Sequence, residues 1–188
     1  MQQTEDPNWI RYANLVTLCR VLLLPPTIYG IVRDIPLATL GGFTLIIASD
    51  FLDGALARRA ARNNPLGTLL DHGADAFVVV ALGVVFARLS YIPTLLPMII
   101  AIAFAQYAFD AQKTSNKRPR PSGLGKANGI AYFVVSGLCI AVHHGNNWLP
   151  SALYELCRNL ATVLAWVLIC STSVSIFQRA QLRGDCVK

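Results

Sequence analysis

The sequence predicts an all-α integral membrane protein with six transmembrane helices. Of its 188 residues, 54% are hydrophobic and only 14% are charged, whereas a soluble domain has about 25% charged residues. Six apolar stretches approach the length of about 20 residues that crosses a bilayer, and polar breaks separate them. This composition excludes a water-soluble monomer, and it excludes a disordered chain, which requires low hydrophobicity. We expect one membrane domain over residues 1–188.

The predicted spans follow one another through the whole chain. In order they are Asn14–Val32, Ile35–Leu56, Leu66–Leu89, Pro93–Ala111, Ala127–Val142 and Leu153–Phe177. The first span contains the adjacent residues Pro25 and Pro26, which predict a kink. Before it, we expect a short amphipathic segment around Trp9–Tyr12 to form a helix in the membrane interface, since Trp and Tyr favour that depth.

The breaks between the spans carry turn residues. Three of them, at residues 33–36, 63–65 and 90–93, contain proline, which disfavours continued helix. A fourth, His143–Asn147, contains Gly and Asn, so we expect its two histidines to be loop residues without a metal-binding role. The remaining connection, Lys113–Lys126, contains two prolines and is long enough to form a loop.

Basic residues divide unevenly between the two sides of this predicted bundle. With six spans, both termini and the second and fourth connections share one side. That side holds twelve Lys and Arg residues, and the other side holds three. The twelve are Arg11, Arg58, Arg59, Arg62, Lys113, Lys117, Arg118, Arg120, Lys126, Arg179, Arg183 and Lys188. The three are Arg33, Arg88 and Arg158. The asymmetry predicts cytoplasmic termini. It also explains the net charge of +6 by attraction to anionic headgroups rather than to nucleic acid.

Four aspartates interrupt the apolar pattern where the second span ends and the third begins. Asp50 and Asp53 are spaced i, i+3, and Asp71 and Asp75 are spaced i, i+4, so each pair lies on one helix face. The short connection between the spans lets them turn back antiparallel, which brings the acidic faces together near the cytoplasmic ends. A carboxylate inside a spanning helix costs about 3 kcal/mol, so by default it marks a function.

The grouping of four carboxylates has a chemical consequence. In a partly apolar site they stay ionised only if cations balance them. Oxygen ligands suit Mg²⁺, Mn²⁺ or Ca²⁺ rather than zinc, and two divalent ions would form the usual clamp for in-line attack at phosphorus. On the same faces, Gly54, Ala57 and Gly67 leave room for a ligand, and Arg58 adds a forked donor for phosphate oxygens.

The segment from Asp50 to Asp75 resembles the signature of the CDP-alcohol phosphotransferases, D-x2-D-G-x2-A-R-x8-G-x3-D-x3-D. Every fixed position matches, through Asp50, Asp53, Gly54, Ala57, Arg58, Gly67, Asp71 and Asp75. Six spans in under 200 residues also fit that family. The opening Asn14 to Arg20, N-L-V-T-L-C-R, and the step Gly125-Lys126 look like those of the bacterial phosphatidylglycerophosphate synthases.

The resemblance implies a reaction in which CDP-diacylglycerol donates its phosphatidyl group to an alcohol and CMP leaves. The acceptor it implies is glycerol-3-phosphate, a phosphorylated alcohol, giving phosphatidylglycerophosphate. It also implies that Asp50, Asp53, Asp71 and Asp75 hold two Mg²⁺ or Mn²⁺ ions and that Asp75 takes the proton of the acceptor hydroxyl. Gly54, Ala57, Arg58 and Gly67 would line the CMP part. We therefore expect a homodimer in the bacterial inner membrane, with the active site facing the cytoplasm.

Two further groups of residues are candidates for binding substrate. Asn14, Thr17 and Arg20 share one helix face and either hydrogen-bond to neighbouring helices or line the nucleotide or acceptor pocket. Arg20 lies about two turns inside its span, so it requires an anionic partner, such as a site carboxylate or a substrate phosphate. The basic residues of the long loop either attract anionic headgroups or, through Lys126 and Arg118, hold an acceptor phosphate.

Other functions stay open at this point. Within the family, the acceptor could instead be phosphatidylglycerol (cardiolipin synthase), inositol phosphate or serine. A metal-ion transporter is a different class, but it would place acids near mid-membrane rather than at the cytoplasmic ends. Two further alternatives are less favoured. The acids could form structural ion pairs with Arg20, Arg58 or Arg59, or the protein could be an inactive lipid-binding scaffold. Against both, the set of four acids is complete and glycines lie in register with it.

Overall fold

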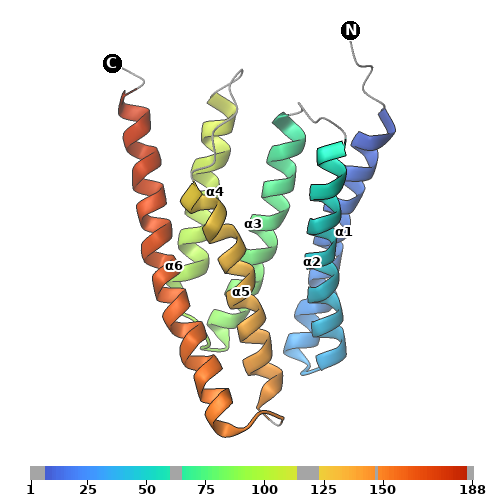
Figure 1. Cartoon of the computed structure of the whole chain (residues 1–188), viewed down its shortest axis with the longest axis vertical. Coiled ribbons are helices and arrows are strands. Elements are labelled where there is room, and N and C mark those ends of the chain that lie inside the picture. The colour runs from blue at the N-terminus through green and yellow to red at the C-terminus, as the bar shows by residue number, and fades with distance from the viewer. Residues whose placement is uncertain (1–6, 60–64, 114–122, 147, 186–188) are drawn as a thin grey trace. The chain divides into compact units, whose positions relative to one another are not determined.

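The computed structural model describes residues 7–59, 65–113, 123–146 and 148–185, and within these ranges it contains helices and no strands. Six helices follow in chain order (Figure 1), namely α1 (Pro7–Val32), α2 (Pro36–Arg59), α3 (Pro65–Arg88), α4 (Leu95–Lys113), α5 (Gly123–Gly145) and α6 (Ser151–Asp185). The all-α fold class predicted from the sequence is therefore confirmed. Each predicted span falls on one helix.

Several helix ends differ from the predicted spans, most of all in α6, which runs over Ser151–Asp185 instead of Leu153–Phe177. Two of the differences correct a specific prediction. The segment Trp9–Tyr12 is not a separate helix, because α1 begins at Pro7 and continues through Pro25 and Pro26 to Val32. The histidines that were expected in a loop, His143 and His144, form the last turn of α5. The helix continues there because no proline stops it before Gly145, and basic residues are favourable next to the carbonyl groups at a helix C-terminus.

The chain forms two compact units. The first, Met1–Val78, contains α1, α2 and the first part of α3, and the second, Val79–Lys188, contains the rest of α3 with α4, α5 and α6. The expectation of a single domain over residues 1–188 stays a prediction.

In the first unit, α1 and α2 pack closely against each other. A Cβ atom added to Gly30 would lie 2.7 Å from the backbone nitrogen of Thr39, and one added to Gly42 would crowd Thr27. Thr27 and Thr39 are fully buried. Small residues at these points let the two backbones approach, as is common between membrane helices.

The same type of turn ends α1 and α3. After α1, the Asp34 N–H donates to the Ile31 carbonyl and the Ile35 N–H donates to the Gly30 carbonyl. This is a Schellman motif, which requires a left-handed residue, and Asp34 supplies it with φ of 52°. After α3, Ser90 takes that position with φ of 61°. Such turns let each following helix reverse direction within a few residues.

In the second unit, α6 packs against both α4 and α5. Small and branched residues of α6 are buried along this contact, among them Ala161, Ala165, Leu168 and Ile169. The Gln106 side chain of α4 donates to the Ile176 carbonyl of α6 at 3.1 Å. These contacts form part of the core of this unit, to which α3, α4 and α5 also contribute buried apolar residues.

Two of the described helices are long and apolar enough to cross a membrane, Gly123–Gly145 and Ser151–Gln181. Shorter apolar stretches are Thr17–Val32, Pro36–Leu52 and Leu95–Asp110. Large apolar side chains are exposed on α6, including Leu156, Val163, Trp166 and Phe177. An exposed apolar surface of this kind is consistent with a membrane protein.

Candidate functional site

Arg20 of α1 connects two of the four signature aspartates. Its side chain is fully buried, with 0% of its surface exposed, and its Nη2 atom lies 3.3 Å from Asp50 Oδ1. Its Nη1 atom donates a hydrogen bond to Asp75 Oδ1. One guanidinium group therefore ties α1 to a carboxylate of α2 and to a carboxylate of α3.

The packing of α1 on α2 explains why Arg20 meets Asp50. The close approach between Thr27 and Gly42 fixes the register of the two antiparallel helices. Arg20 lies about two turns before Thr27, and Asp50 lies about two turns after Gly42. In an antiparallel pair these displacements run in the same direction, so the two side chains come to the same level.

The charges of this cluster are unevenly balanced. An arginine stays protonated in proteins, so Arg20 offsets part of the repulsion between Asp50 and Asp75. Among the side chains that the structure describes in this cluster, one cation faces two carboxylates, which leaves these three groups with a net negative charge. The two carboxylates remain partly exposed, at 47% for Asp50 and 31% for Asp75, so a ligand can reach them.

The donor chemistry of this cluster fits a hard divalent cation. A carboxylate has about four acceptor positions, and the contacts with Arg20 use the Oδ1 atoms of Asp50 and Asp75. One contact with Arg20 uses only part of the acceptor capacity that a carboxylate has. Oxygen atoms are the ligands that Mg²⁺ prefers, and Mn²⁺ also accepts them.

For most of the other predicted site residues, the structure describes the backbone but not the side chain. Thr17 is half-buried one turn before Arg20, and Lys126 is exposed in the first turn of α5, in the second unit. The backbones of seven more residues belong to α1, α2 or α3, while their side chains lie outside the described part of the structure, namely Asn14, Asp53, Gly54, Ala57, Arg58, Gly67 and Asp71. Arg118 lies outside the described residues altogether. The prediction that Arg20 has an anionic partner is confirmed.

A second polar cluster, between α5 and α6, was missed by the sequence reasoning. The Ser171 hydroxyl donates to Asn128 Oδ1 at 2.7 Å, and Asn128 Nδ2 donates to Thr172 Oγ1 at 3.4 Å. The Tyr132 hydroxyl also contacts Thr172 Oγ1. The available signal was the pair Asn128 and Tyr132, one helical turn apart in an apolar span. This cluster holds the first turns of α5, where Lys126 lies, against α6.

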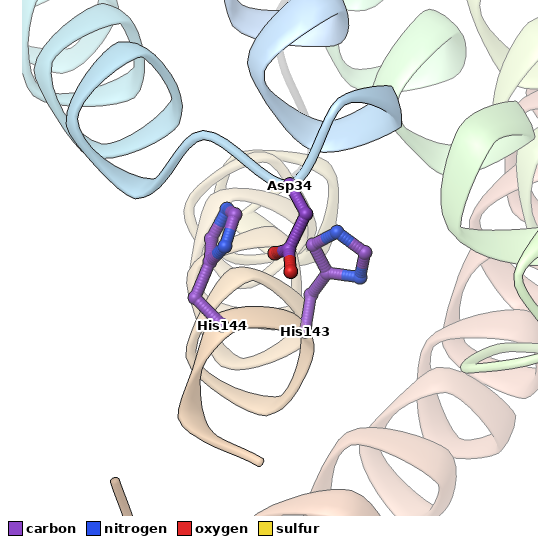
Figure 2. Close-up of side chains that lie close together, drawn as sticks. All are labelled: Asp34, His143 and His144. Carbon is purple, nitrogen blue, oxygen red and sulfur yellow. The ribbon is translucent and has the colours of Figure 1, made fainter. Parts of the chain in front are cut away.

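The two histidines of α5 form a third group. Figure 2 draws both side chains on the last turn of that helix. The ring centroids of His143 and His144 lie 4.7 Å apart. The Tyr91 hydroxyl and His143 Nδ1 lie 3.1 Å apart and share a hydrogen bond. Asp34, also drawn in Figure 2, belongs to the first unit. Because the two histidines belong to the second unit and the carboxylate of Asp34 does not, we assign no metal site to this group. We treat the histidines as part of the packing of the second unit, where His143 contacts Tyr91.

Comparison with known proteins agrees with the signature. The family model described as CDP-alcohol phosphatidyltransferase matches residues 10–177. A CDP-diacylglycerol--glycerol-3-phosphate 3-phosphatidyltransferase from Pseudomonas fluorescens is 39% identical over 71 residues, which cover 35% of this chain and 35% of that protein. The match thus spans about a third of the relative's length. No solved structure matches the chain. Because the family model covers most of the sequence, including both groups of aspartates, the chain belongs to the CDP-alcohol phosphatidyltransferase family.

Proposed function

We propose that this protein transfers the phosphatidyl group of CDP-diacylglycerol to an alcohol acceptor, with release of CMP. The observation that carries the proposal is the meeting of Asp50 and Asp75 at Arg20. These are the first and last acids of the signature, and their convergence is what a shared metal and phosphate site requires. Family membership supports the reaction class. The name of the Pseudomonas fluorescens relative supports glycerol-3-phosphate as the acceptor, which would make phosphatidylglycerophosphate the product.

The proposal includes a membrane setting. All six helices would cross the bilayer, with both termini in the cytoplasm and the four acids near the cytoplasmic surface of the bacterial inner membrane. The uneven distribution of Lys and Arg supports this orientation. The lipid substrate would then reach the acids from the bilayer, and the soluble acceptor would reach them from the cytoplasm. We also propose that the protein is a homodimer, by resemblance to its family.

The four aspartates, Asp50, Asp53, Asp71 and Asp75, would together hold two Mg²⁺ or Mn²⁺ ions. The partial exposure and oxygen chemistry of Asp50 and Asp75 support this assignment. When bound, the ions would neutralise the pyrophosphate and stabilise the negative charge that develops at phosphorus.

The residues of the chain would position the reactants and move one proton. The acceptor oxygen attacks the phosphorus that carries diacylglycerol, the bond from that phosphorus to the CMP oxygen breaks, and CMP leaves with the bonding electrons. Asp75 would accept the proton of the attacking hydroxyl. Gly54, Ala57, Arg58 and Gly67 would line the CMP part, while Asn14 and Thr17 would contribute to the nucleotide or acceptor pocket.

The basic residues before and within α5 would bind the acceptor phosphate. Lys126 is exposed in the first turn of α5, and the buried cluster around Asn128 fixes that turn against α6. An exposed cation on a fixed helix end is suited to a phosphate. Arg118, which precedes α5 in the sequence, would assist it.

An acceptor screen tests the proposal. The purified protein is incubated with CDP-diacylglycerol, Mn²⁺ or Mg²⁺, and one alcohol at a time, and CMP release is measured. The panel is glycerol-3-phosphate, phosphatidylglycerol, inositol phosphate and serine, with a reaction lacking acceptor as control. We expect release above the control with glycerol-3-phosphate. Release with another alcohol would keep the reaction class and change the acceptor, and no release with any alcohol would overturn the function.

A further inference from the structure

Arg20 has a feature that a simple interhelical tie does not need, since it contacts two carboxylates from two different helices at once. Its planar guanidinium holds its donors in a fixed fork, so the Asp50 and Asp75 oxygens that it contacts are kept at a set separation. Its own position is fixed by complete burial in α1. The relative placement of these two acids thus depends on a third helix.

The charge of Arg20 matters most when no divalent cation is present. Four aspartates from two helix ends would then repel one another. A guanidinium does not lose its proton in proteins, so the countercharge from Arg20 is permanent. It can offset one carboxylate in the metal-free protein and so reduce the tendency of α2 and α3 to separate.

The contact with Arg20 also limits how the carboxyl groups can turn. Arg20 contacts the Oδ1 atoms of both Asp50 and Asp75, and a carboxylate can accept several bonds. A bond from Arg20 to Oδ1 restrains the rotation of the Asp75 carboxyl group. The direction in which that group presents its acceptor positions to a metal or to a hydroxyl is thereby restrained as well.

We propose that Arg20 is a positioning residue of the acid site, which orients Asp75 against Asp50 and keeps the acids assembled without metal. This inference rests on the proposed function for its catalytic part, because it assigns Arg20 a role in turnover through Asp75. Its structural part, the stability of the metal-free site, is measured without substrate. The two parts can therefore fail separately.

The test compares Arg20→Gln and Arg20→Lys with wild type in the full-length protein. Arg88→Gln, in which an exposed arginine of α3 is replaced, is the matched control. Thermal unfolding is first followed without substrate, once in EDTA and once in saturating Mn²⁺. We expect Arg20→Gln to lower Tm in EDTA by about 5 °C or more, and Mn²⁺ to restore most of this loss. Arg88→Gln should follow wild type in both conditions.

Turnover and nucleotide binding are then measured in saturating Mn²⁺. Arg20→Gln should keep its affinity for CDP within about threefold of wild type and lose at least about tenfold in kcat, since general acid–base steps depend on orientation. Arg20→Lys keeps a charge but lacks the fork, so its Tm in EDTA should lie between those of wild type and Arg20→Gln. Its kcat should still fall about tenfold.

Three results would overturn the inference. An equal loss of Tm in EDTA and in Mn²⁺ would make Arg20 an ordinary packing residue. Wild-type kcat in Arg20→Lys would show that the bridging geometry is unimportant, and this variant decides the point even if Arg20→Gln does not fold. A wild-type protein that Mn²⁺ does not stabilise would remove the metal assignment and this inference with it. A wild-type protein that Mn²⁺ stabilises but that releases no CMP would instead overturn the proposed function.

Discussion

The close contact between α1 and α2 yields a prediction that isolates one steric interaction. In Gly42→Ala the new Cβ atom would lie 3.2 Å from Thr27 Cβ and 3.4 Å from Thr27 Cα, and closer still to Thr27 Oγ1. Thr27 is fully buried, and its hydroxyl donates to the Leu23 carbonyl at 2.7 Å. Rotating the hydroxyl away would therefore break a hydrogen bond and still leave the Cβ and Cα atoms crowded.

Gly41→Ala is the matched control, because a Cβ atom at Gly41 meets nothing within 4 Å. Both substitutions gain about 1 kcal/mol in helix propensity, so this term cancels in the comparison. Overpacking costs about 1–3 kcal/mol, and 1 kcal/mol shifts Tm by about 2–4 °C in a chain of this size. Gly42→Ala should therefore unfold about 2–12 °C below Gly41→Ala.

The assay is thermal unfolding of the purified protein in detergent. Adding Thr27→Ala to Gly42→Ala removes the Oγ1 atom and should recover part of the difference. Because the same contact sets the register of Arg20 and Asp50, Gly42→Ala should also lower turnover, whereas Gly41→Ala should not. Equal Tm values for the two glycine variants would refute the reasoning about this helix pair.

Three other expectations follow from the structure and the proposed chemistry. Excess EDTA should abolish CMP release and added Mg²⁺ or Mn²⁺ should restore it, so undiminished turnover in EDTA would contradict the metal assignment. Lys126→Ala should raise KM for glycerol-3-phosphate by about 10-fold or more, because a lost charge-assisted hydrogen bond costs about 1.5–3 kcal/mol. The KM for CDP-diacylglycerol should change less. Equal effects on the two KM values would indicate that Lys126 serves general attraction to the membrane. Ser90→Gly should raise Tm, since a non-glycine residue in the left-handed region costs about 1–2 kcal/mol, and an unchanged or lower Tm would count against the strained turn after α3.

The helices could be predicted from the sequence because long apolar stretches and proline-containing breaks are local features. The errors also have local causes. The segment before Asn14 carries polar residues but no helix-stopping residue, so α1 extends back to Pro7. The Gly and Asn residues of the break His143–Asn147 suggested a loop, yet α5 includes both histidines.

The candidate site could be predicted in part. The depth of Arg20 in its span predicted an anionic partner but left open whether that partner is a site carboxylate or a substrate phosphate. The structure identifies Asp50 and Asp75 as the partners. The hydrogen bonds of Asn128 with Ser171 and Thr172 could not be predicted, because residues more than 40 positions apart meet only through the register of α5 on α6. The crowding of Thr27 against Gly42 depends on helix register in the same way.

The central claim is that the acid cluster performs phosphatidyl transfer with Asp75 as the base. The most direct measurement is CMP release by Asp75→Asn, together with calorimetric binding of the nucleotide. The amide keeps the shape of the side chain and an oxygen ligand but cannot accept the proton. We predict binding of CDP-diacylglycerol within about tenfold of wild type and a loss of at least about 10²-fold in kcat. Asp53→Asn should differ by weakening nucleotide binding as well as turnover. A near wild-type rate for Asp75→Asn would contradict the account, since the proton would then leave through another group.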